Sequence, residues 1–540
     1  MLGEYLLFTT VKFVVQNSSM QKLLLLPIFL ISLELISQSV VQYTDYYDKD
    51  STIKRSEGVF VNGIEEGKWV FWFRSGNIME ESYFTEGKLN GKVTIWYANG
   101  QKQNEGLFRF NIQDSAYSSW YENGKLNSIG KFKMGFKDSI WEYYFPDGTL
   151  YKKEKWQKRE KRLIMANDIS GKNTLSAGTG VLFHWNGDEL AEKNNYKDSV
   201  KNGQSIIYFP ENKVKSKGNY SNGKRDGKWL IYYPNGFLKS ELTYDKGDRT
   251  GEAKNYYEDG SIKTKGSYLK NKKNGYWEFT ASSGKLYMKG GFVGDLQNDL
   301  WTYYYEDSEQ KDSEGNFIKG KKEGEWNFWY DNGALWRKGT YSEGVKDSLW
   351  TTWFENGNKL QEGNYVKGLE EGEWWAWYKN GVKKDHGFYE TGKMTGLWEG
   401  WFDNSKDNYR GNMSNGLKTG KWEFWYFNGK PREAGPYTKG SKDGYWTYYF
   451  PSGIVENEGP YKNSRKHGTW KYYLEYGQLQ REMSYKYDRL DGKSVIYYPG
   501  KGIMSETSYR NGKNHGVWLI YDEQGRVIKK IEYQNGVKVN

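Results

Sequence analysis

A 24-residue repeat constrains the fold of this chain more than any other feature. An aromatic-centred position, called the slot from here on, recurs 19 times, and 15 of the 18 intervals between slots are 24 residues long. Thirteen of the slots hold Trp. A fixed period of this length predicts an array of stacked repeats instead of several globular domains. The slots are Trp69, Val93, Tyr117, Trp141, Gly180, Ser205, Trp229, Ala253, Trp277, Trp301, Trp326, Trp350, Trp374, Trp398, Trp422, Trp446, Trp470, Ser494 and Trp518.

Each repeat has the pattern of a β-hairpin. The residues two to four positions after a slot are mostly aromatic or β-branched, as in Ile231, Tyr232 and Tyr233, which is typical of a strand. Asn235 and Gly236 follow. Asn-Gly between two short strands favours a hairpin turn, because both residues tolerate positive φ.

The second strand of each repeat carries an aliphatic residue, a Gly and an aromatic residue at even offsets, so these three share one face. After Trp326 they are Leu335, Gly339 and Tyr341. A Gly in a strand leaves a hollow, and we expect a neighbouring slot Trp to pack into it. This packing would explain why Trp and Gly occur together in the repeat.

Composition supports an aromatic core. Hydrophobic residues make up 36% of the chain and aromatic residues 18%, so rings must supply most of the buried area. A lone hairpin is barely stable in water, and the hairpins must therefore pair edge to edge. We predict an all-β fold, an elongated single-layer antiparallel sheet of about 19 stacked β-hairpin repeats of 24 residues.

The N-terminal residues do not carry the repeat. Met20-Gln21-Lys22 is followed by an almost unbroken apolar stretch from 23 to 36 and then by small residues up to Ser39, as in a secretory signal peptide. We predict an N-terminal extension and signal peptide over residues 1–39, with the signal starting at Met20. The protein would then be exported to the periplasm, the outer surface or the medium. An uncleaved N-terminal anchor is the alternative.

The rest of the chain divides into a linker and the array. Residues 40–56 are a polar linker, and residues 57–536 form the hairpin array. A basic insertion near 150–178 interrupts the array, where the interval between Trp141 and Gly180 is 39 residues.

At this point the residues resemble a known family, the MORN repeat in its bacterial variant form. The resemblance covers about nine-tenths of the chain and implies a single-layer antiparallel sheet with rows of aromatic side chains. It also implies membrane or lipid association, protein scaffolding, or an antitoxin role, and it brings no catalytic residues. The predicted export signal argues against a cytoplasmic antitoxin. The pattern is clearest at Gly227, Lys228, Trp229, Tyr232, Tyr233, Asn235 and Gly236, and at Gly420, Lys421, Trp422, Trp425, Tyr426, Asn428 and Gly429.

The sequence offers little for catalysis. The absence of Cys excludes disulfides, zinc–thiolate sites and a lipid-modified N-terminal cysteine. No glycine-rich phosphate loop is present, and a repeated surface lacks the unique constellation that catalysis needs. We expect no enzyme activity, no cofactor, no metal and no small-molecule substrate. The four His residues, which fall in unrelated repeat phases, are His184, His386, His467 and His515.

A net charge of +11 is mild for 540 residues and is spread over turns, so we expect no nucleic-acid partner. One stretch of the insertion is more basic, although Glu154 and Glu160 dilute it. It could dock an anionic partner such as lipid headgroups, a polysaccharide or an acidic protein, or it could be a solvated loop that bulges from the sheet. This basic stretch comprises Lys152, Lys153, Lys155, Lys158, Arg159, Lys161 and Arg162.

A second candidate site lies three positions after the slot, on the opposite face of the strand. Five successive repeats hold Trp there, and equivalent rings would lie about 10 Å apart. Exposed, they would form a platform for sugar rings or an extended peptide; alternatively, they pack on each other and on their neighbours to stabilise the sheet. This tryptophan row comprises Trp329, Trp353, Trp377, Trp401 and Trp425.

These observations predict a non-enzymatic, exported repeat scaffold at the cell envelope. Its partner would be a protein or a glycan, and an anionic membrane surface is a further candidate. Many weak repeated contacts would gain strength through multivalency. The alternatives are an antitoxin-type protein that neutralises a toxin partner and a peripheral membrane-binding protein.

Overall fold

A computed structural model describes residues 38–50, 52–306 and 308–539. The predicted N-terminal extension and signal peptide lie outside the described residues, apart from residues 38 and 39. The chain forms two compact units, 1–162 and 163–540, and each is considered by itself.

The first unit consists of short antiparallel strands, the last of which runs past residue 162. The strands are β1 (Val40–Tyr46), β2 (Lys54–Val61), β3 (Ile64–Trp72), β4 (Ile78–Thr85), β5 (Lys88–Leu89), β6 (Gly91–Trp96), β7 (Lys102–Arg109), β8 (Ile112–Trp120), β9 (Leu126–Lys133), β10 (Phe136–Tyr144), β11 (Leu150–Gln157) and β12 (Glu160–Asn167).

The second unit continues the same pattern over a longer stretch of chain. Its strands are β13 (Asn173–Ser176), β14 (Thr179–Asn186), β15 (Glu189–Lys197), β16 (Val200–Tyr208), β17 (Val214–Ser221), β18 (Lys224–Tyr232), β19 (Leu238–Asp245), β20 (Asp248–Tyr256), β21 (Ile262–Leu269), β22 (Lys272–Thr280), β23 (Leu286–Val293), β24 (Leu296–Tyr304), β25 (Lys311–Ile318), β26 (Lys321–Trp329), β27 (Leu335–Ser342), β28 (Val345–Trp353), β29 (Lys359–Val366), β30 (Leu369–Trp377), β31 (Lys383–Glu390), β32 (Lys393–Trp401), β33 (Asp407–Ser414), β34 (Leu417–Trp425), β35 (Pro431–Thr438), β36 (Ser441–Lys442), β37 (Gly444–Tyr449), β38 (Val455–Lys462), β39 (Arg465–Tyr473), β40 (Leu479–Lys486), β41 (Arg489–Tyr497), β42 (Ile503–Arg510), β43 (Lys513–Asn514), β44 (Gly516–Tyr521), β45 (Val527–Gln534) and β46 (Val537–Lys538).

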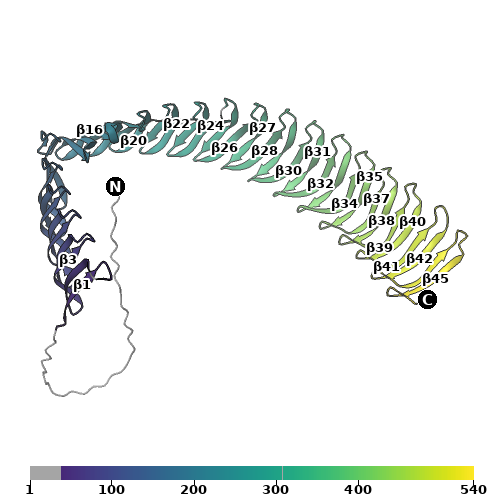
Figure 1. The fold of residues 1–540 in the computed structure, drawn as a ribbon. Helices are drawn as coiled ribbons and strands as arrows, with labels where there is room; N and C mark the ends of the chain where they lie inside the picture. Colours follow the sequence, from purple (N-terminus) through teal and green to yellow (C-terminus); the bar gives the residue numbers. More distant parts are fainter. Residues whose placement is uncertain (1–37, 51, 307, 540) are drawn as a thin grey trace, which may run out of the picture. The chain divides into compact units, whose positions relative to one another are not determined.

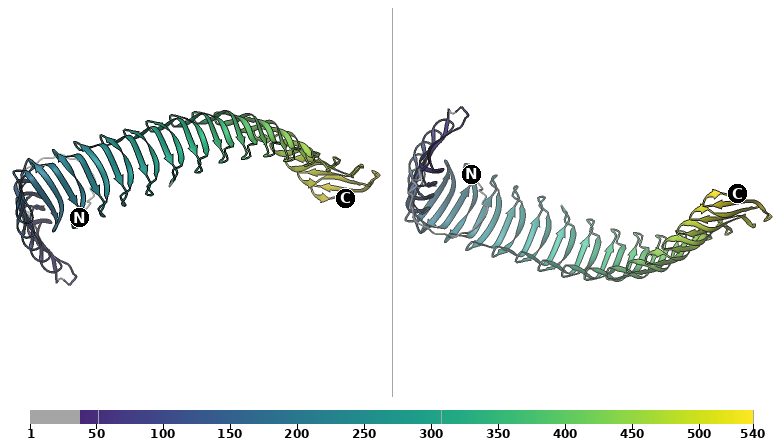
Figure 2. Two further views of the ribbon diagram at one scale, coloured as in Figure 1. Left: turned by 90° about the horizontal axis from the view of Figure 1, so that it is seen from above. Right: turned by 90° about the horizontal axis from the view of Figure 1, so that it is seen from below.

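The predicted fold class is confirmed. The described residues form an open antiparallel sheet of 46 strands arranged as hairpin repeats, and their one helix is the short 3-10 turn Pro210–Asn212. Within the second unit, the hairpins from β16 to β45 follow one another in chain order (Figures 1 and 2). None of the described helical segments has the length and apolarity needed to cross a membrane.

The predicted packing of slot Trp on Gly is confirmed. Gly435 lies on β35, next to β37 with Trp446, and a Cβ added to Gly435 would lie less than 3.0 Å from the Trp446 indole ring. Trp446 has no exposed surface, and its Nε1–H donates a hydrogen bond to the Pro436 carbonyl at 3.0 Å. An equivalent Gly lies eleven residues before the slot in twelve of the thirteen repeats whose slot residue is Trp.

Two of the slots without Trp, Ala253 and Ser494, show the complementary arrangement. Ala253 has a Leu, Leu242, across the strand pair, and Ser494 has Met483. A small slot residue is thus matched by a large partner, as close packing of the interior requires. In the second unit, slot residues and their neighbours form two clusters of buried, mostly aromatic residues, one from Ala253 to Tyr365 and one from Trp398 to Trp470.

The turn after each slot strand differs from the expected type. In the turn Tyr233–Phe237 only Gly236 has positive φ, at 91°. Asn235 contributes to the turn through the hydrogen bonds of its side chain. Its amide donates to the Glu258 carbonyl of the next repeat at 2.9 Å, and its oxygen accepts from the Phe237 N–H at 3.0 Å. Asn is therefore suited to this position because its side chain forms a hydrogen bond that links two consecutive repeats. The turns that lead to the next slot have two residues with positive φ, as at 222–223, and among the turns after the slot strands Glu211 and Asn212 also have it.

Two segments differ from the predicted organisation. The expected polar linker at 40–56 contains β1, which pairs with β2 and places Tyr43 against Trp69. The insertion near 150–178 is not a loop, because most of its residues belong to the strands β11, β12 and β13. It therefore acts as additional sheet, in which Leu163 and Leu175 are buried.

Candidate functional site

The tryptophan row lies on the face opposite the slots, as predicted. Along β30, Trp374 pairs with Gly387 and Ala376 with Asp385 on one face, whereas Trp377 pairs with Lys383 on the other. All five indoles of the row are partly buried, and none belongs to the core clusters of the slot face.

Lysine side chains and the backbone hold the row in place. Lys311 Nζ lies 5.6 Å from the ring centroid of Trp329, and Lys359 Nζ lies 5.4 Å from that of Trp377. The Tyr330 hydroxyl donates to the Trp353 carbonyl at 2.9 Å. The rings of the row have a limited connection with each other, through Trp375, which stacks at 6.3 Å on both Trp377 and Trp401.

Ion pairs lie between the indoles on this face. Lys338 pairs with Glu325 at 2.9 Å, and Arg410 pairs with Glu399 at 2.7 Å. Aromatic surface therefore alternates with charged groups that can donate and accept hydrogen bonds. Such a face can bind a partner that is partly apolar and partly polar.

The structure does not gather the basic stretch into one patch. Lys152 and Glu154 share the slot face, and Lys153 and Lys155 share the opposite face, because their cross-strand partners on β10 alternate in the same way. Lys152 Nζ is 2.8 Å from the buried Glu154 carboxylate, and Lys153 Nζ is 2.7 Å from Glu142. Two of the seven cations of the expected patch are thus paired with carboxylates of the sheet.

The remaining cations of the stretch are exposed. Arg159 lies 3.7 Å from the ring centroid of Phe136, and Lys161 lies 3.8 Å from Glu154. Lys155, Lys158 and Arg162 are exposed as well. The alternative of a loop that bulges from the sheet does not apply, and the exposed charge is less concentrated than the sequence indicates.

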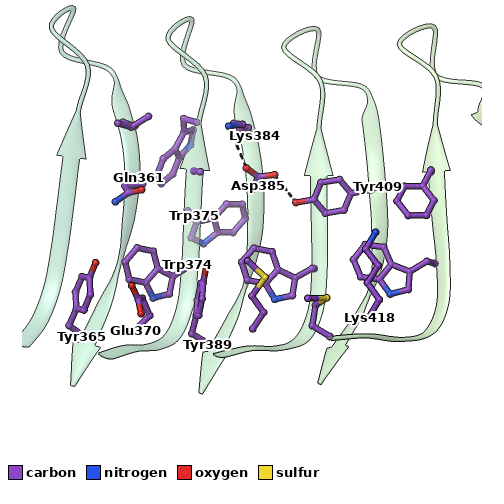
Figure 3. A pocket seen from close by; sticks show the side chains of 18 residues that line it. Gln361, Tyr365, Glu370, Trp374, Trp375, Lys384, Asp385, Tyr389, Tyr409 and Lys418 are labelled. Carbon is purple, nitrogen blue, oxygen red and sulfur yellow. Dashed lines mark hydrogen bonds and ion pairs between the residues drawn. The ribbon is translucent and has the colours of Figure 1, made fainter. Parts of the chain in front are cut away.

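The slot face of the second unit contains a pocket that sequence reasoning missed. It has a volume of about 550 Å³ and lies over β29 to β34, around Trp374, Trp398 and Trp422 (Figure 3). We call it the Trp398 pocket. Trp375 and Trp377 also border it. Its volume is within the range of ligand-binding cavities.

The Trp398 pocket exists because two successive repeats have small residues two positions after the slot. Most repeats hold a bulky residue there, such as Phe328 or Tyr448, but here the residues are Ala376 and Gly400. Asp385 lies between them, directly across from both. The aromatic row of the slot face is therefore interrupted at this point.

The same two repeats lack a cation that other repeats possess. In eight repeats a Lys or Arg four residues before the slot lies 3.9 to 5.0 Å from the ring centroid of the slot Trp. Before Trp374 and Trp398 this position holds Glu370 and Met394. Trp69, Trp301 and Trp518 also lack the cation, but a bulky residue follows each of them two positions later.

Asp385 and Tyr409 form the polar centre of the Trp398 pocket. The Tyr409 hydroxyl donates to Asp385 Oδ1 at 2.7 Å, and its ring covers Gly400 (Figure 3). Burial raises the pKa of the Tyr409 hydroxyl well above its usual range, and the hydrogen bond to Asp385 raises it further. Lys384 Nζ is 4.0 Å from Asp385, but that lysine is half exposed.

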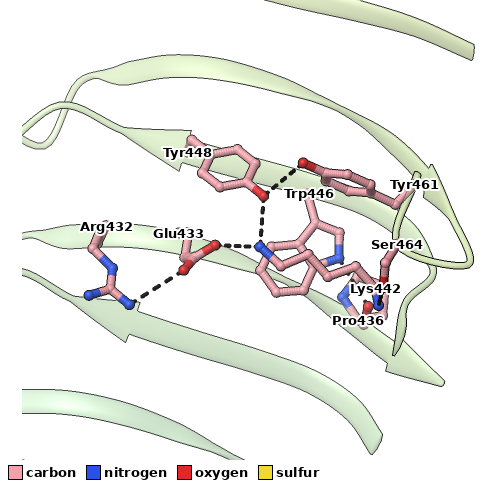
Figure 4. Close-up of polar contacts among 8 residues, drawn as sticks. All are labelled: Arg432, Glu433, Pro436, Lys442, Trp446, Tyr448, Tyr461 and Ser464. Carbon is pink, nitrogen blue, oxygen red and sulfur yellow. Dashed lines mark hydrogen bonds and ion pairs between the residues drawn. The ribbon is translucent and has the colours of Figure 1, made fainter. Parts of the chain in front are cut away.

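A regular repeat nearby shows what the pocket lacks. Around Trp446, the Lys442 ammonium lies 3.9 Å from the indole centroid and 2.6 Å from the Glu433 carboxylate (Figure 4). It also donates to the Tyr448 hydroxyl at 2.8 Å, which in turn donates to Tyr461 at 3.1 Å. We call these five residues the Lys442 cluster.

The four His residues are not brought together. His386 stacks on Trp375 with ring centroids 3.9 Å apart and lies 2.9 Å from Glu373. His467 lies against Tyr487, in a different part of the second unit. Within the described ranges, no three His, Cys, Asp or Glu side chains form a group that could hold a metal ion.

Comparison with known proteins supports the repeat assignment. The family described as MORN repeat variant matches twelve segments of the chain. None of the curated proteins matches the sequence. The matched segments are 65–86, 89–109, 113–134, 201–222, 225–246, 249–270, 322–343, 346–367, 418–439, 442–463, 466–487 and 514–535.

Solved structures match the chain with low identity. A crystal structure of TcdB2-TccC3 is 10% identical, with 92% of this chain and 36% of that chain covered, at a TM-score of 0.13. The Photorhabdus luminescens Tc holotoxin pore is 9% identical, with 93% and 31% covered, at a TM-score of 0.12. The chain thus spans about a third of the length of these solved chains, and their functions do not transfer to it.

Proposed function

We propose, from the premise that the chain belongs to the MORN repeat proteins in their variant form, that it is a non-catalytic binding scaffold. Its partner would be an extended polymer that runs along the tryptophan row. The observation that carries this proposal is the unbroken series of five partly exposed indoles at one register position of one sheet face.

The spacing of the row favours an extended peptide. Two strands separate successive rings, so equivalent indoles lie about 10 Å apart. A polyproline II helix has three residues per turn and rises about 9.3 Å per turn. Every third side chain therefore points in the same direction, at an interval close to the spacing of the indoles. Proline-rich segments commonly bind in grooves lined by aromatic side chains. A glycan chain is the alternative outcome of the experiment below.

Export to the cell envelope is part of the proposal and rests on residues 20–39. Fusion of residues 20–60 to a reporter enzyme that is active only outside the cytoplasm should give activity. Retention of the fusion in the cytoplasm would contradict the proposed location. Membrane binding through the basic stretch is less well supported, because its cations alternate between the two faces.

Binding can be tested by substituting two residues of the tryptophan row that lie outside the Trp398 pocket. We expect Trp329→Ala combined with Trp353→Ala to weaken binding of a proline-rich peptide by about ten-fold or more, since a repeated contact is lost twice. Fluorescence anisotropy of a labelled peptide would measure it, with a panel of soluble polysaccharides run in parallel.

Tyr256→Ala is the matched control. Tyr256 occupies the same repeat position, and its carbonyl accepts from Tyr233 at 2.9 Å, as that of Trp353 accepts from Tyr330. We expect it to leave binding unchanged. An unchanged affinity in the double Trp variant, or an equal loss in the Tyr256 variant, would reject the platform. Lost amide protection of β26 and β28 would show instead that the indoles are structural.

A further inference from the structure

The Lys442 cluster shows how this sheet binds an ammonium group. The Lys442 ammonium contacts an indole face, a carboxylate and a phenol hydroxyl at 3.9, 2.6 and 2.8 Å, the last two as direct polar contacts (Figure 4). Both Lys442 and Glu433 are largely buried, with side-chain exposures of 22% and 18%. The arrangement combines cation–π attraction with a charge-assisted hydrogen bond.

The Trp398 pocket retains this arrangement without its ammonium. Asp385 occupies the position of Glu433 in the repeat, thirteen residues before the slot, and Trp398 corresponds to Trp446. Met394 stands where Lys442 would be. Because Gly400 replaces the counterpart of Tyr448, a cavity of about 550 Å³ opens where the lysine head group and the phenol would lie.

The walls of the pocket are those that suit an organic cation. The Trp374 ring lies between Tyr365 and Tyr389, with ring centroids 5.2 and 5.6 Å away, and Tyr389 also contacts Trp398 at 5.4 Å. Glu370 adds a second carboxylate beside Trp374 (Figure 3). Among the described residues, no side chain accepts a hydrogen bond from the buried Nε1–H of Trp374.

The cations near the pocket do not replace the missing one. Lys418 already lies 4.4 Å from the ring centroid of Trp422, and burial lowers the pKa of its ammonium. Lys384 is half exposed and reaches Asp385 only at 4.0 Å, a geometry that contributes little attraction at a surface. The indoles of Trp374 and Trp398 therefore lack an internal cation, and they share the pocket with the carboxylates of Glu370 and Asp385, the latter with one oxygen bound to Tyr409.

We propose that the Trp398 pocket binds a methylated ammonium compound. A primary ammonium needs hydrogen-bond acceptors such as the Tyr448 hydroxyl, whereas the counterpart here is Gly400 and the Tyr409 hydroxyl is already bound to Asp385. Methyl groups around the nitrogen would fill the space and contact the aromatic rings, as in other cages for quaternary ammonium. Met394 and Met413 supply polarisable surface. The site is centred on slot-face residues, and only Trp377 of the tryptophan row borders it, so it does not depend on the proposed function.

Calorimetric titration of the full chain with choline, and separately with trimethyl-lysine, tests the proposal and distinguishes a free metabolite from a modified side chain. The control ligand is the neutral isostere of choline in which carbon replaces nitrogen. We expect at least one cation to bind with a Kd of about 1 mM or tighter, and the neutral isostere to bind at least about ten-fold more weakly. Equal affinity for the isostere, or no binding of either cation at about 10 mM, would overturn the proposal.

Variants locate the binding. Met394→Lys restores the internal ammonium and should weaken cation binding by about ten-fold or more, and Asp385→Asn should weaken it by about three-fold or more. Leu490→Lys is the matched control, because it adds the same charge at the same repeat position before Ser494. Full affinity in the Met394 and Asp385 variants, or an equal loss in the Leu490 variant, would place the binding elsewhere. Unchanged amide protection, of β30 to β34 for the pocket variants and of β40 and β41 for the Leu490 variant, would show that each variant remains folded.

Discussion

The Lys442 cluster and the Trp398 pocket are built from the same repeat positions, yet one is closed and the other is open. In the cluster, an internal lysine joins the slot indole, a carboxylate and two phenols. In the pocket, Met394, Gly400 and Met413 occupy the positions of Lys442, Tyr448 and Tyr461, and the carboxylate remains as Asp385. Three changes in one repeat thus convert a structural ion pair into a cavity, while the backbone pairing stays the same.

The comparison teaches which residues stabilise the sheet and which are available to a ligand. The slot Trp and its Gly are present in both places, so they belong to the scaffold. The residues around them differ, and in the cluster the chain itself satisfies every polar group. A repeat that lacks both the internal cation and the bulky residue two positions after the slot keeps the scaffold and borders a cavity.

The largest expected difference between the two regions follows removal of the slot indole. Trp446→Ala should destabilise its repeats by about 3–5 kcal/mol, because a fully buried ring is lost and a cavity remains. Trp398→Ala should cost less, since one side of that ring already faces the pocket. Hydrogen exchange of β35 to β38 against β31 to β34 would measure the two losses locally, which suits an array that need not unfold as one unit. Equal losses would show that the pocket is filled in solution.

A second change opens the closed cluster. Lys442→Met should destabilise by about 1–3 kcal/mol, because it leaves the largely buried Glu433 with only Arg432, at 3.4 Å, as a charged partner. Adding Glu433→Gln to this variant should recover part of the loss, and a double-mutant cycle on local hydrogen exchange measures the coupling. No coupling between the two positions would mean that the ion pair contributes nothing.

A third change acts on the pocket and carries a pH dependence. Tyr409→Phe should cost about 1 kcal/mol at neutral pH, because Asp385 loses a hydrogen-bond donor. The folded-state pKa of Tyr409 is raised above the ordinary value of 10.0, so the contribution of this tyrosine is complete below pH 10 and is lost as the pH rises above it. Urea unfolding of both chains from pH 7 to pH 11 should show the difference shrinking above pH 10. A difference that grows with pH would contradict the sign.

The smallest expected effect is the reverse conversion. Met394→Lys should stabilise the repeats around Trp398 by about 0.5 kcal/mol, since the new ammonium can lie over the indole beside Asp385. A small rise in Tm and slower amide exchange in β31 and β32 would support it. A clear destabilisation would mean that the ammonium of the longer side chain does not reach the indole and the carboxylate.

The sequence was sufficient to predict the hairpin repeat and the contact of slot Trp with Gly. Residues such as Trp446 and Gly435 recur at a fixed distance, and strand periodicity assigns each to a face. The tryptophan row was assigned to its face for the same reason. Its role as a platform remains a proposal.

Other features needed the three-dimensional pairing. The sequence left the basic stretch open as a docking patch or a bulging loop, whereas its lysines alternate between the two faces of the sheet because the chain continues as β11 and β12. The Trp398 pocket depends on absent side chains, and Ala376 and Gly400 are inconspicuous in a glycine-rich chain. Their signal was nevertheless present: in an alignment of the repeats against each other, Glu370 and Met394 interrupt the run of basic residues four positions before the slot.

The contact between slot Trp and Gly has a consequence for how the length of such a chain can change. Each indole docks on a Gly eleven residues earlier, so removal of residues 350–373 would bring Gly339 to that same distance from Trp374. The junction would be indistinguishable from any other in the array. Whole repeats can therefore be gained or lost without a new interface, and the separation between two binding surfaces can change in steps of about 10 Å. Recombination within the gene of such a chain can therefore change the length of the array by whole repeats.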